Sequence, residues 1–135
     1  MKKLTDIVAR LSSLVVNTEE AAKGQFNLDS LTHTQMLYLE TISLLGNPNI
    51  TELAVKLKLT KPTVTVAVDR LIERDYVIKI RSDADRRSAH LHLTEKGKLI
   101  NQMHDYAHKL IAEAIVKRLE KEEVELLTAL LSKAL

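Results

Sequence analysis

The segment from Lys61 to Arg70 carries side chains that can bind both the base edges and the backbone of a nucleic acid. Threonine hydroxyls and a lysine ammonium can hydrogen-bond to base edges, and a valine methyl can contact the methyl group of thymine. An arginine further along the segment suits a backbone phosphate. The residues that we expect to perform this chemistry are Lys61, Thr63, Thr65, Val66 and Arg70.

Some residues in and next to this segment could have a purely structural role instead of contacting a nucleic acid. Thr60 and Thr63 are residues that can cap a helix, and Val64 fits the buried face of one. We nevertheless expect at least one of Lys61, Thr63 and Val66 to contact a base.

A polar stretch without glycine, residues 82–87, contains two adjacent arginines. A guanidinium can enter the narrow minor groove of DNA, and Asp83 or Asp85 could orient it through a bidentate pair. The alternative is a solvated turn whose ion pairs are worth under about 1 kcal/mol. We favour DNA contact, and the candidates in this stretch and at its edge are Arg81, Asp85, Arg86 and Arg87.

Two histidines, His104 and His108, are one helical turn apart and could bind zinc. Glu19 or Glu20 could supply a third ligand from an earlier helix. A zinc-responsive regulator is therefore an alternative interpretation of the chain.

The composition argues against catalysis. The chain has no cysteine, which excludes a disulfide framework, a thiolate metal site and a catalytic cysteine. It shows no nucleophile with a plausible base and no glycine-rich phosphate loop, and aromatic residues make up 3% of it. We expect a binding protein that needs no cofactor and is not an enzyme.

Positive charge is concentrated in the middle of the chain. Residues 51–98 hold 11 Lys and Arg against 7 Asp and Glu, a net charge of +4, whereas the remainder holds 9 against 11, a net charge of −2. A basic segment favours contact with phosphates, because each such contact releases counterions.

The chain has neither a run of 18 apolar residues nor the pattern of a signal peptide at its start. We therefore expect a cytoplasmic protein without a membrane partner.

Apolar residues with helical spacing predict a helix over residues 3 to about 23 and another from 33 to 45. Thr32 and Gln35 form the pattern of a capping box at the start of the second helix. Shorter helices, from 50 to about 58 and from 61 to about 74, form a helix-turn-helix whose second helix we expect to enter the DNA groove.

The apolar period then changes to two in residues 76–81 and 88–93, which predicts a β-hairpin, or wing, over residues 76–93. Thr94 is placed to cap a helix from 95 to about 119, and a last helix follows from about 121 to 134. We expect one mainly α-helical domain over residues 1–135, with a winged helix-turn-helix at 31–94.

The terminal segments, residues 1–30 and 95–135, have broad apolar faces for which a chain of 135 residues offers little core. We expect these faces to pack against the same helices of a second subunit.

Several motifs together resemble the MarR family of bacterial transcription regulators. They occur in the order and with the spacing of that family: Asn49–Leu59, Thr60–Thr65, Asp69–Leu71, Tyr76–Val77, Asp83–Ser88 and Leu93–Gly97. Within the family, the stretch from Arg81 to His108 is most similar to the firmicute repressors of fatty-acid synthesis genes.

The resemblance implies a homodimer that binds a short inverted repeat in double-stranded DNA. It also implies that Arg86 enters the minor groove and that Asp85 anchors it. It argues against a metal, because zinc-sensing members carry ligands along the first helix and at the start of the second, where this chain has Met36 and Leu37.

The family also implies an effector site between the winged segment and the dimerisation helices, for a small lipophilic ligand or an acyl group. The residues that we expect to line it are Leu14, Asn17, Thr18, Phe26, Met36, Tyr38 and Met103. A winged helix that serves only for protein contacts is the remaining alternative, because a fold does not fix a function.

Overall fold

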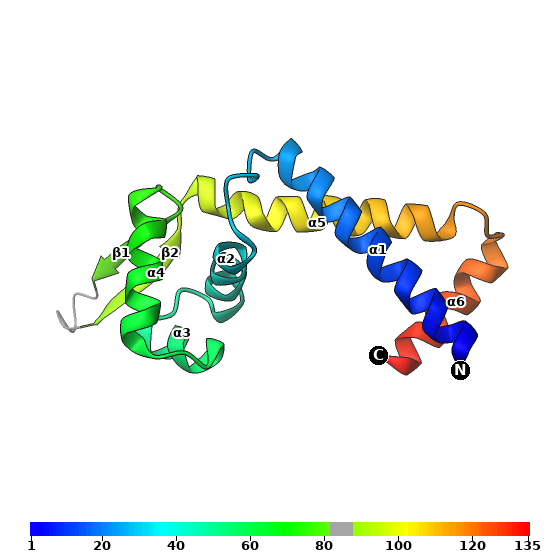
Figure 1. Cartoon of the computed structure of the whole chain (residues 1–135), viewed down its shortest axis with the longest axis horizontal. Helices are drawn as coiled ribbons and strands as arrows, with labels where there is room; N and C mark the ends of the chain where they lie inside the picture. Colours follow the sequence, from blue (N-terminus) through cyan, green and yellow to red (C-terminus); the bar gives the residue numbers. More distant parts are fainter. Residues whose placement is uncertain (82–87) are drawn as a thin grey trace. The chain divides into compact units, whose positions relative to one another are not determined.

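The computed structural model describes residues 1–81 and 88–135, and these residues form helices and one two-stranded sheet (Figure 1). The elements in chain order are α1 (Lys2–Gln25), α2 (His33–Leu45), α3 (Ile50–Leu57), α4 (Lys61–Glu73), β1 (Val77–Arg81), β2 (Ala89–Leu93), α5 (Glu95–Val116) and α6 (Lys121–Ala134). The mainly helical fold with a β-hairpin after a helix-turn-helix is thus confirmed. None of the helices in the described residues is both long and apolar enough to span a membrane.

The chain divides into two compact units. Unit 1 consists of Met1–Ala22 and His104–Leu135, and therefore contains most of α1, the second half of α5, and α6. Unit 2 is Lys23–Met103 and contains α2, α3, α4, the hairpin and the start of α5.

Side-chain caps set the starts of α2, as its sequence predicts, and of α3. The Thr32 hydroxyl accepts the amide N–H of Gln35 at 3.1 Å, and the Gln35 side-chain oxygen accepts the amide N–H of Thr32 at 3.0 Å. Asn49 and Glu52 form the same reciprocal pair, at 2.8 and 3.2 Å. Each pair satisfies two amide groups that the first turn of a helix leaves without partners.

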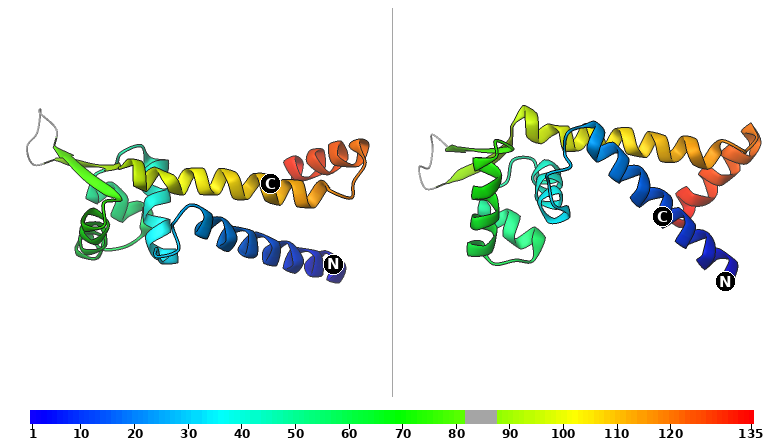
Figure 2. Two further views of the ribbon diagram at one scale, coloured as in Figure 1. Left: turned by 90° about the horizontal axis from the view of Figure 1, so that it is seen from above. Right: turned by 45° about the horizontal axis from the view of Figure 1, so that its top comes forward.

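Each strand begins one residue later than expected, β1 at Val77 and β2 at Ala89. Tyr76 instead ends the turn after α4, because its amide N–H donates to the carbonyl oxygen of Leu71 at 2.9 Å. The strands pair antiparallel, with Val77 opposite Leu93 and Arg81 opposite Ala89. Both views of Figure 2 show the hairpin extending from the helices of unit 2.

Helix α5 ends at Val116, earlier than the expected position near residue 119. The amide N–H of Leu119 donates to the carbonyl oxygen of Val116 at 2.9 Å, which closes a turn before α6 begins.

The core of unit 2 is built from apolar side chains of every element in that unit. Its fully buried members include Leu39, Ile42, Leu53, Val64, Val68, Leu71, Tyr76, Val77, Leu91 and Ile100. Since burial of each large apolar side chain contributes about 1.5–3 kcal/mol, this core holds the helix-turn-helix and the hairpin together.

Gly97, in the first turns of α5, packs directly against the backbone of Tyr76. A β-carbon at this position would overlap with the carbonyl oxygen of Tyr76 and would lie 3.3 Å from the β-carbon of Leu93. Only glycine lets α5 approach the junction of α4 and β1 so closely.

We therefore expect Gly97→Ala to lower the free energy of unfolding by about 1–3 kcal/mol, the usual cost of forcing atoms into a packed site. Gly24→Ala is the matched control, because a β-carbon there would lie 3.9 Å from its nearest neighbour, Asp29. Urea unfolding at one fixed protein concentration measures both changes. Equal stabilities of the two variants would contradict the packing argument.

Candidate nucleic-acid interface

Helix α4 has a buried face and an exposed face, separated by the period of the helix. Val64, Val68 and Leu71 are fully buried in unit 2. Thr63, Val66 and Arg70, at intervals of three and four residues, lie on one exposed stripe, and Val66 is 54% exposed. This stripe presents a hydroxyl, a branched apolar group and a guanidinium to solvent.

The hydroxyl of Thr63 takes part in the cap of α4 but keeps its own proton for another partner. The Thr60 hydroxyl donates to the Thr63 hydroxyl oxygen at 2.8 Å and accepts the amide N–H of Thr63 at 3.4 Å. A hydroxyl has one donor and two acceptor positions. The capping role and a base contact of Thr63 are therefore compatible.

Two further candidate residues of α4 lie outside the stripe. Thr65 is half-buried, and two residues of helix place it about 200° around the axis from Thr63. Lys61 is the first residue of α4 and is exposed. Lys61 and Thr65, four residues apart, therefore lie on the same side of α4, away from the stripe, where the long lysine side chain has more reach than threonine.

At the hairpin, Arg81 is the last residue of β1 and is exposed. Asp85, Arg86 and Arg87 lie outside the described residues.

The structure adds Lys79 of β1, which the sequence interpretation did not include. Its ammonium lies 3.7 Å from a carboxylate oxygen of Asp69 on α4, and its side chain is 39% exposed. Lys79 also lines a shallow hollow together with Asn49 and Thr51, at the start of α3, and Ser88. The signal in the sequence that could have identified Lys79 is the presence of a lysine within a short apolar strand.

Arg74 fixes the end of α4 to the start of α2. Its guanidinium donates to the side-chain oxygen of Gln35 at 3.0 Å, and to the hydroxyl and carbonyl oxygens of Ser30 at 2.8 and 3.2 Å. Gln35 is the same residue that caps α2, so one side chain joins the capping box of α2 to the last turn of α4.

Two cationic side chains lie over the aromatic ring of Tyr76, just after the C-terminal end of α4. The guanidinium of Arg74 is 5.4 Å and the ammonium of Lys96 is 4.4 Å from the centre of its ring. Lys96 also donates to the carbonyl oxygen of Arg74 at 2.9 Å. Cation–π contacts of this kind contribute about 0.5–2 kcal/mol each, so they reinforce the junction.

The residues expected at an effector site are distributed over both units. Leu14, Asn17 and Thr18 belong to unit 1, and Phe26, Met36, Tyr38 and Met103 belong to unit 2. Met36, Tyr38 and Met103 are buried, Asn17 is exposed, and the others are half-buried. Their common role in one site stays a prediction.

Two of these residues have specific surroundings within their units. The Thr18 hydroxyl donates to the carbonyl oxygen of Leu14 at 2.7 Å. Tyr38 lines a small cavity beside Thr34, Gln35 and Arg70, and burial raises the pKa of its hydroxyl above the ordinary value. The phenol therefore stays a neutral hydrogen-bonding group.

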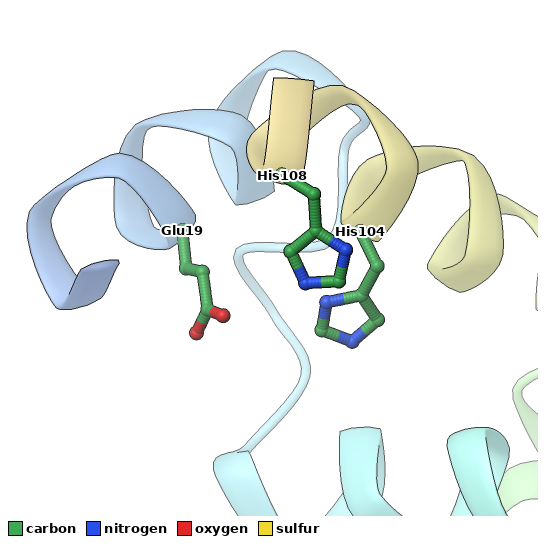
Figure 3. A group of neighbouring side chains, drawn as sticks. All are labelled: Glu19, His104 and His108. Carbon is green, nitrogen blue, oxygen red and sulfur yellow. The ribbon is translucent and has the colours of Figure 1, made fainter. Parts of the chain in front are cut away.

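In unit 1 the structure brings the two histidines of α5 together with Glu19 of α1 (Figure 3). The sequence left Glu19 and Glu20 open as third members, and only Glu19 joins the group.

The MarR family model matches residues 31–89, which include α2, α3, α4, β1 and the first residue of β2. The HTH-type transcriptional regulator MhqR of Bacillus subtilis is 30% identical to the chain over 105 residues, which cover 76% of the chain and 71% of MhqR.

Two solved structures resemble the whole chain. The structure of Streptococcus pneumoniae FabT in complex with DNA is 26% identical, with a TM-score of 0.70, and the match covers 98% of this chain and 92% of FabT. The transcriptional regulator Tm0710 of Thermotoga maritima is 25% identical, with a TM-score of 0.77, and the match covers 99% and 92%.

The contacts of Arg74 lead to a test of how α4 is held. We expect Arg74→Met to lower the free energy of unfolding by about 1–3 kcal/mol, because it removes a charged donor from three acceptors. Arg70→Met, four residues earlier on the exposed stripe, should change it by less than about 0.5 kcal/mol. Urea unfolding compares the two, and equal losses would refute a special role for Arg74.

Proposed function

The chain belongs to the MarR family, and from this we propose that it is a homodimeric repressor that binds an inverted repeat in duplex DNA. Members of this family are transcription regulators. The chain is accordingly a DNA-binding regulator of transcription and not an enzyme.

The exposed stripe of α4 is the observation that carries the proposal. In a helix-turn-helix the second helix lies in the major groove, and its first turns reach the bases. Thr63 and Val66 occupy those turns and face solvent, whereas Arg70 lies further along, where a phosphate contact is expected. The structure of the related FabT in complex with DNA supports DNA as the partner.

We assign further contacts to residues outside the stripe, most of them basic. Lys61 would reach a base or a phosphate from the start of α4, with Thr65 beside it. Arg86, oriented by Asp85, would enter the minor groove, and Arg81 and Arg87 would neutralise phosphates. These roles for residues 85–87 rest on the resemblance and on the chemistry of the residues.

A second copy of the chain would cover the apolar faces of unit 1. The exposed apolar side chains of α1 and α6 include Leu4, Ile7, Val8, Leu11, Leu126, Leu130 and Leu131. So many exposed large apolar side chains on two helices are typical of a subunit interface. Two-fold symmetry of the dimer would match that of an inverted repeat.

We further propose that a small lipophilic ligand or an acyl group modulates DNA binding. The buried or half-buried members of the expected effector residues, Met36, Tyr38 and Phe26 among them, combine apolar surface with a neutral phenol. An effector that prefers one arrangement of the dimer would shift the population that fits the operator.

Selection of bound sequences from random duplex DNA, followed by binding at several salt concentrations, tests the function. We expect an inverted repeat with half-sites about one helical turn apart. Salt-sensitive binding without an enriched sequence would show only the electrostatic component. That outcome, or no binding, would reject an operator-specific repressor and favour a winged helix that contacts proteins.

Two variants of α4 separate base contacts from phosphate contacts in the same assay. Thr63→Val keeps the shape of the side chain but removes the hydroxyl, so we expect a loss of about 1–3 kcal/mol in discrimination at one base pair of each half-site. Arg70→Ala should weaken binding to all sequences and reduce the salt slope by about 1 per subunit. Lys109→Ala, exposed on α5, is the control for a lost positive charge. If Arg70→Ala behaves like Lys109→Ala, α4 does not bind along the proposed face.

The dimer has its own test. Leu130→Asp places a charge on the exposed apolar face of α6 in both copies, and we expect the dissociation constant of the dimer to rise about 100-fold or more. Ser132→Asp introduces the same charge two residues away and off this face, so it is the matched control. Analytical ultracentrifugation over a concentration series measures both, and an unchanged dimer in Leu130→Asp would exclude this face from the interface.

A further inference from the structure

Glu19, His104 and His108 form a cluster in unit 1 that the proposed DNA binding does not use. One ligand atom from each residue lies within 4.8 Å of the other two. The two imidazole rings stack, with their centres 5.9 Å apart and their planes inclined by 24°. Figure 3 shows the two rings close together on one helix and the side chain of Glu19 beside them on the other.

The donor set of this cluster has a definite chemical preference. Two imidazole nitrogens and one carboxylate oxygen suit zinc, which takes three protein ligands of this kind and leaves a fourth position open. The chain has no cysteine, so no thiolate competes for the ion.

The distances are compatible with closure around such an ion. Zinc bonds of about 2.0–2.1 Å in a tetrahedral site place ligand atoms about 3.3 Å apart. The cluster must therefore contract by roughly 1.5 Å from its widest separation. Side-chain rotation can supply this, since His108 is exposed and Glu19 and His104 are only half-buried. The exposed side of His108 also leaves access for a water molecule as fourth ligand.

The positions of the three residues in the chain distinguish the cluster from a random meeting of surface groups. His104 and His108 are one turn apart on α5, and Glu19 comes from α1, so the donors converge from two separate helices. In the part of the chain that the structure describes, no other three potential ligands converge in this way. The group does not involve the start of α2, where Met36 and Leu37 offer no ligand.

We propose that Glu19, His104 and His108 bind one divalent transition-metal ion per chain, with the donor chemistry of a zinc site. The ion ties α1 to α5 within unit 1. Because a ligand that binds only the folded state stabilises it, unit 1 becomes more resistant to unfolding as the metal concentration rises.

Metal titration of the untagged, EDTA-treated full chain tests the proposal without DNA. We expect calorimetry to show one Zn²⁺ per chain and thermal unfolding to shift upward with added Zn²⁺. Co²⁺ should give the intense visible absorption of a four-coordinate site. Each of the variants His104→Ala, His108→Ala and Glu19→Gln should weaken Zn²⁺ binding by at least about tenfold and abolish the thermal shift.

Neighbouring residues provide matched controls for these variants. Glu20→Gln changes the adjacent glutamate, and His92→Ala removes a histidine of the hairpin, so both should bind Zn²⁺ within twofold of the unaltered chain. Circular dichroism and thermal unfolding without metal establish that each variant is folded, and exposed His108 is the position least sensitive to substitution. Zn²⁺ affinity that survives His108→Ala or Glu19→Gln, or that falls equally in Glu20→Gln, overturns the site. Absence of binding to the unaltered chain at micromolar Zn²⁺ does the same, and neither result affects the proposed DNA binding.

Discussion

The backbone of Tyr76 is the point on which the geometry of unit 2 depends. Its amide N–H bonds to the carbonyl of Leu71 and so ends α4, and its carbonyl accepts the amide N–H of Thr94 at 3.1 Å, where β2 passes into α5. Tyr76 is 1% exposed, and Gly97 packs against its carbonyl group. One buried residue thus connects the helix that carries the DNA-binding candidates, the hairpin and the start of α5.

Most of this fold could be predicted from local signals. Thr32 with Gln35 and Asn49 with Glu52 interact across only three residues, so their patterns in the sequence determine the starts of α2 and α3 directly. Strand and helix ends were less predictable where a backbone turn intervenes, as at Tyr76 and Leu119. The support of α4 by Arg74 could not be predicted, because Ser30 and Gln35 lie 44 and 39 residues away.

The same distinction between local and distant contacts explains the candidate interface. Helical period alone separates buried Val64 from exposed Thr63 and Val66. It does not show how far each residue projects from the body of the unit, and Thr65 proved half-buried.

The choice between Glu19 and Glu20 as the neighbour of the two histidines could not be predicted for a different reason. Adjacent residues in a helix differ by about 100° in direction, and only the packing of α1 and α5 in unit 1 selects Glu19 over Glu20.

The two units differ in how completely they bury their own apolar residues. Unit 2 has a closed core, whereas none of the residues of α6, all of which the structure describes, is buried, and Leu126 and Leu130 are 60% and 57% exposed. A helix of fourteen residues gains little stability from its backbone alone and depends on the packing of its apolar face. If a second copy supplies that packing, assembly and folding of unit 1 are coupled, as is common in obligate homodimers. Protein concentration would then control both the stability of unit 1 and the fraction of chains able to occupy two half-sites.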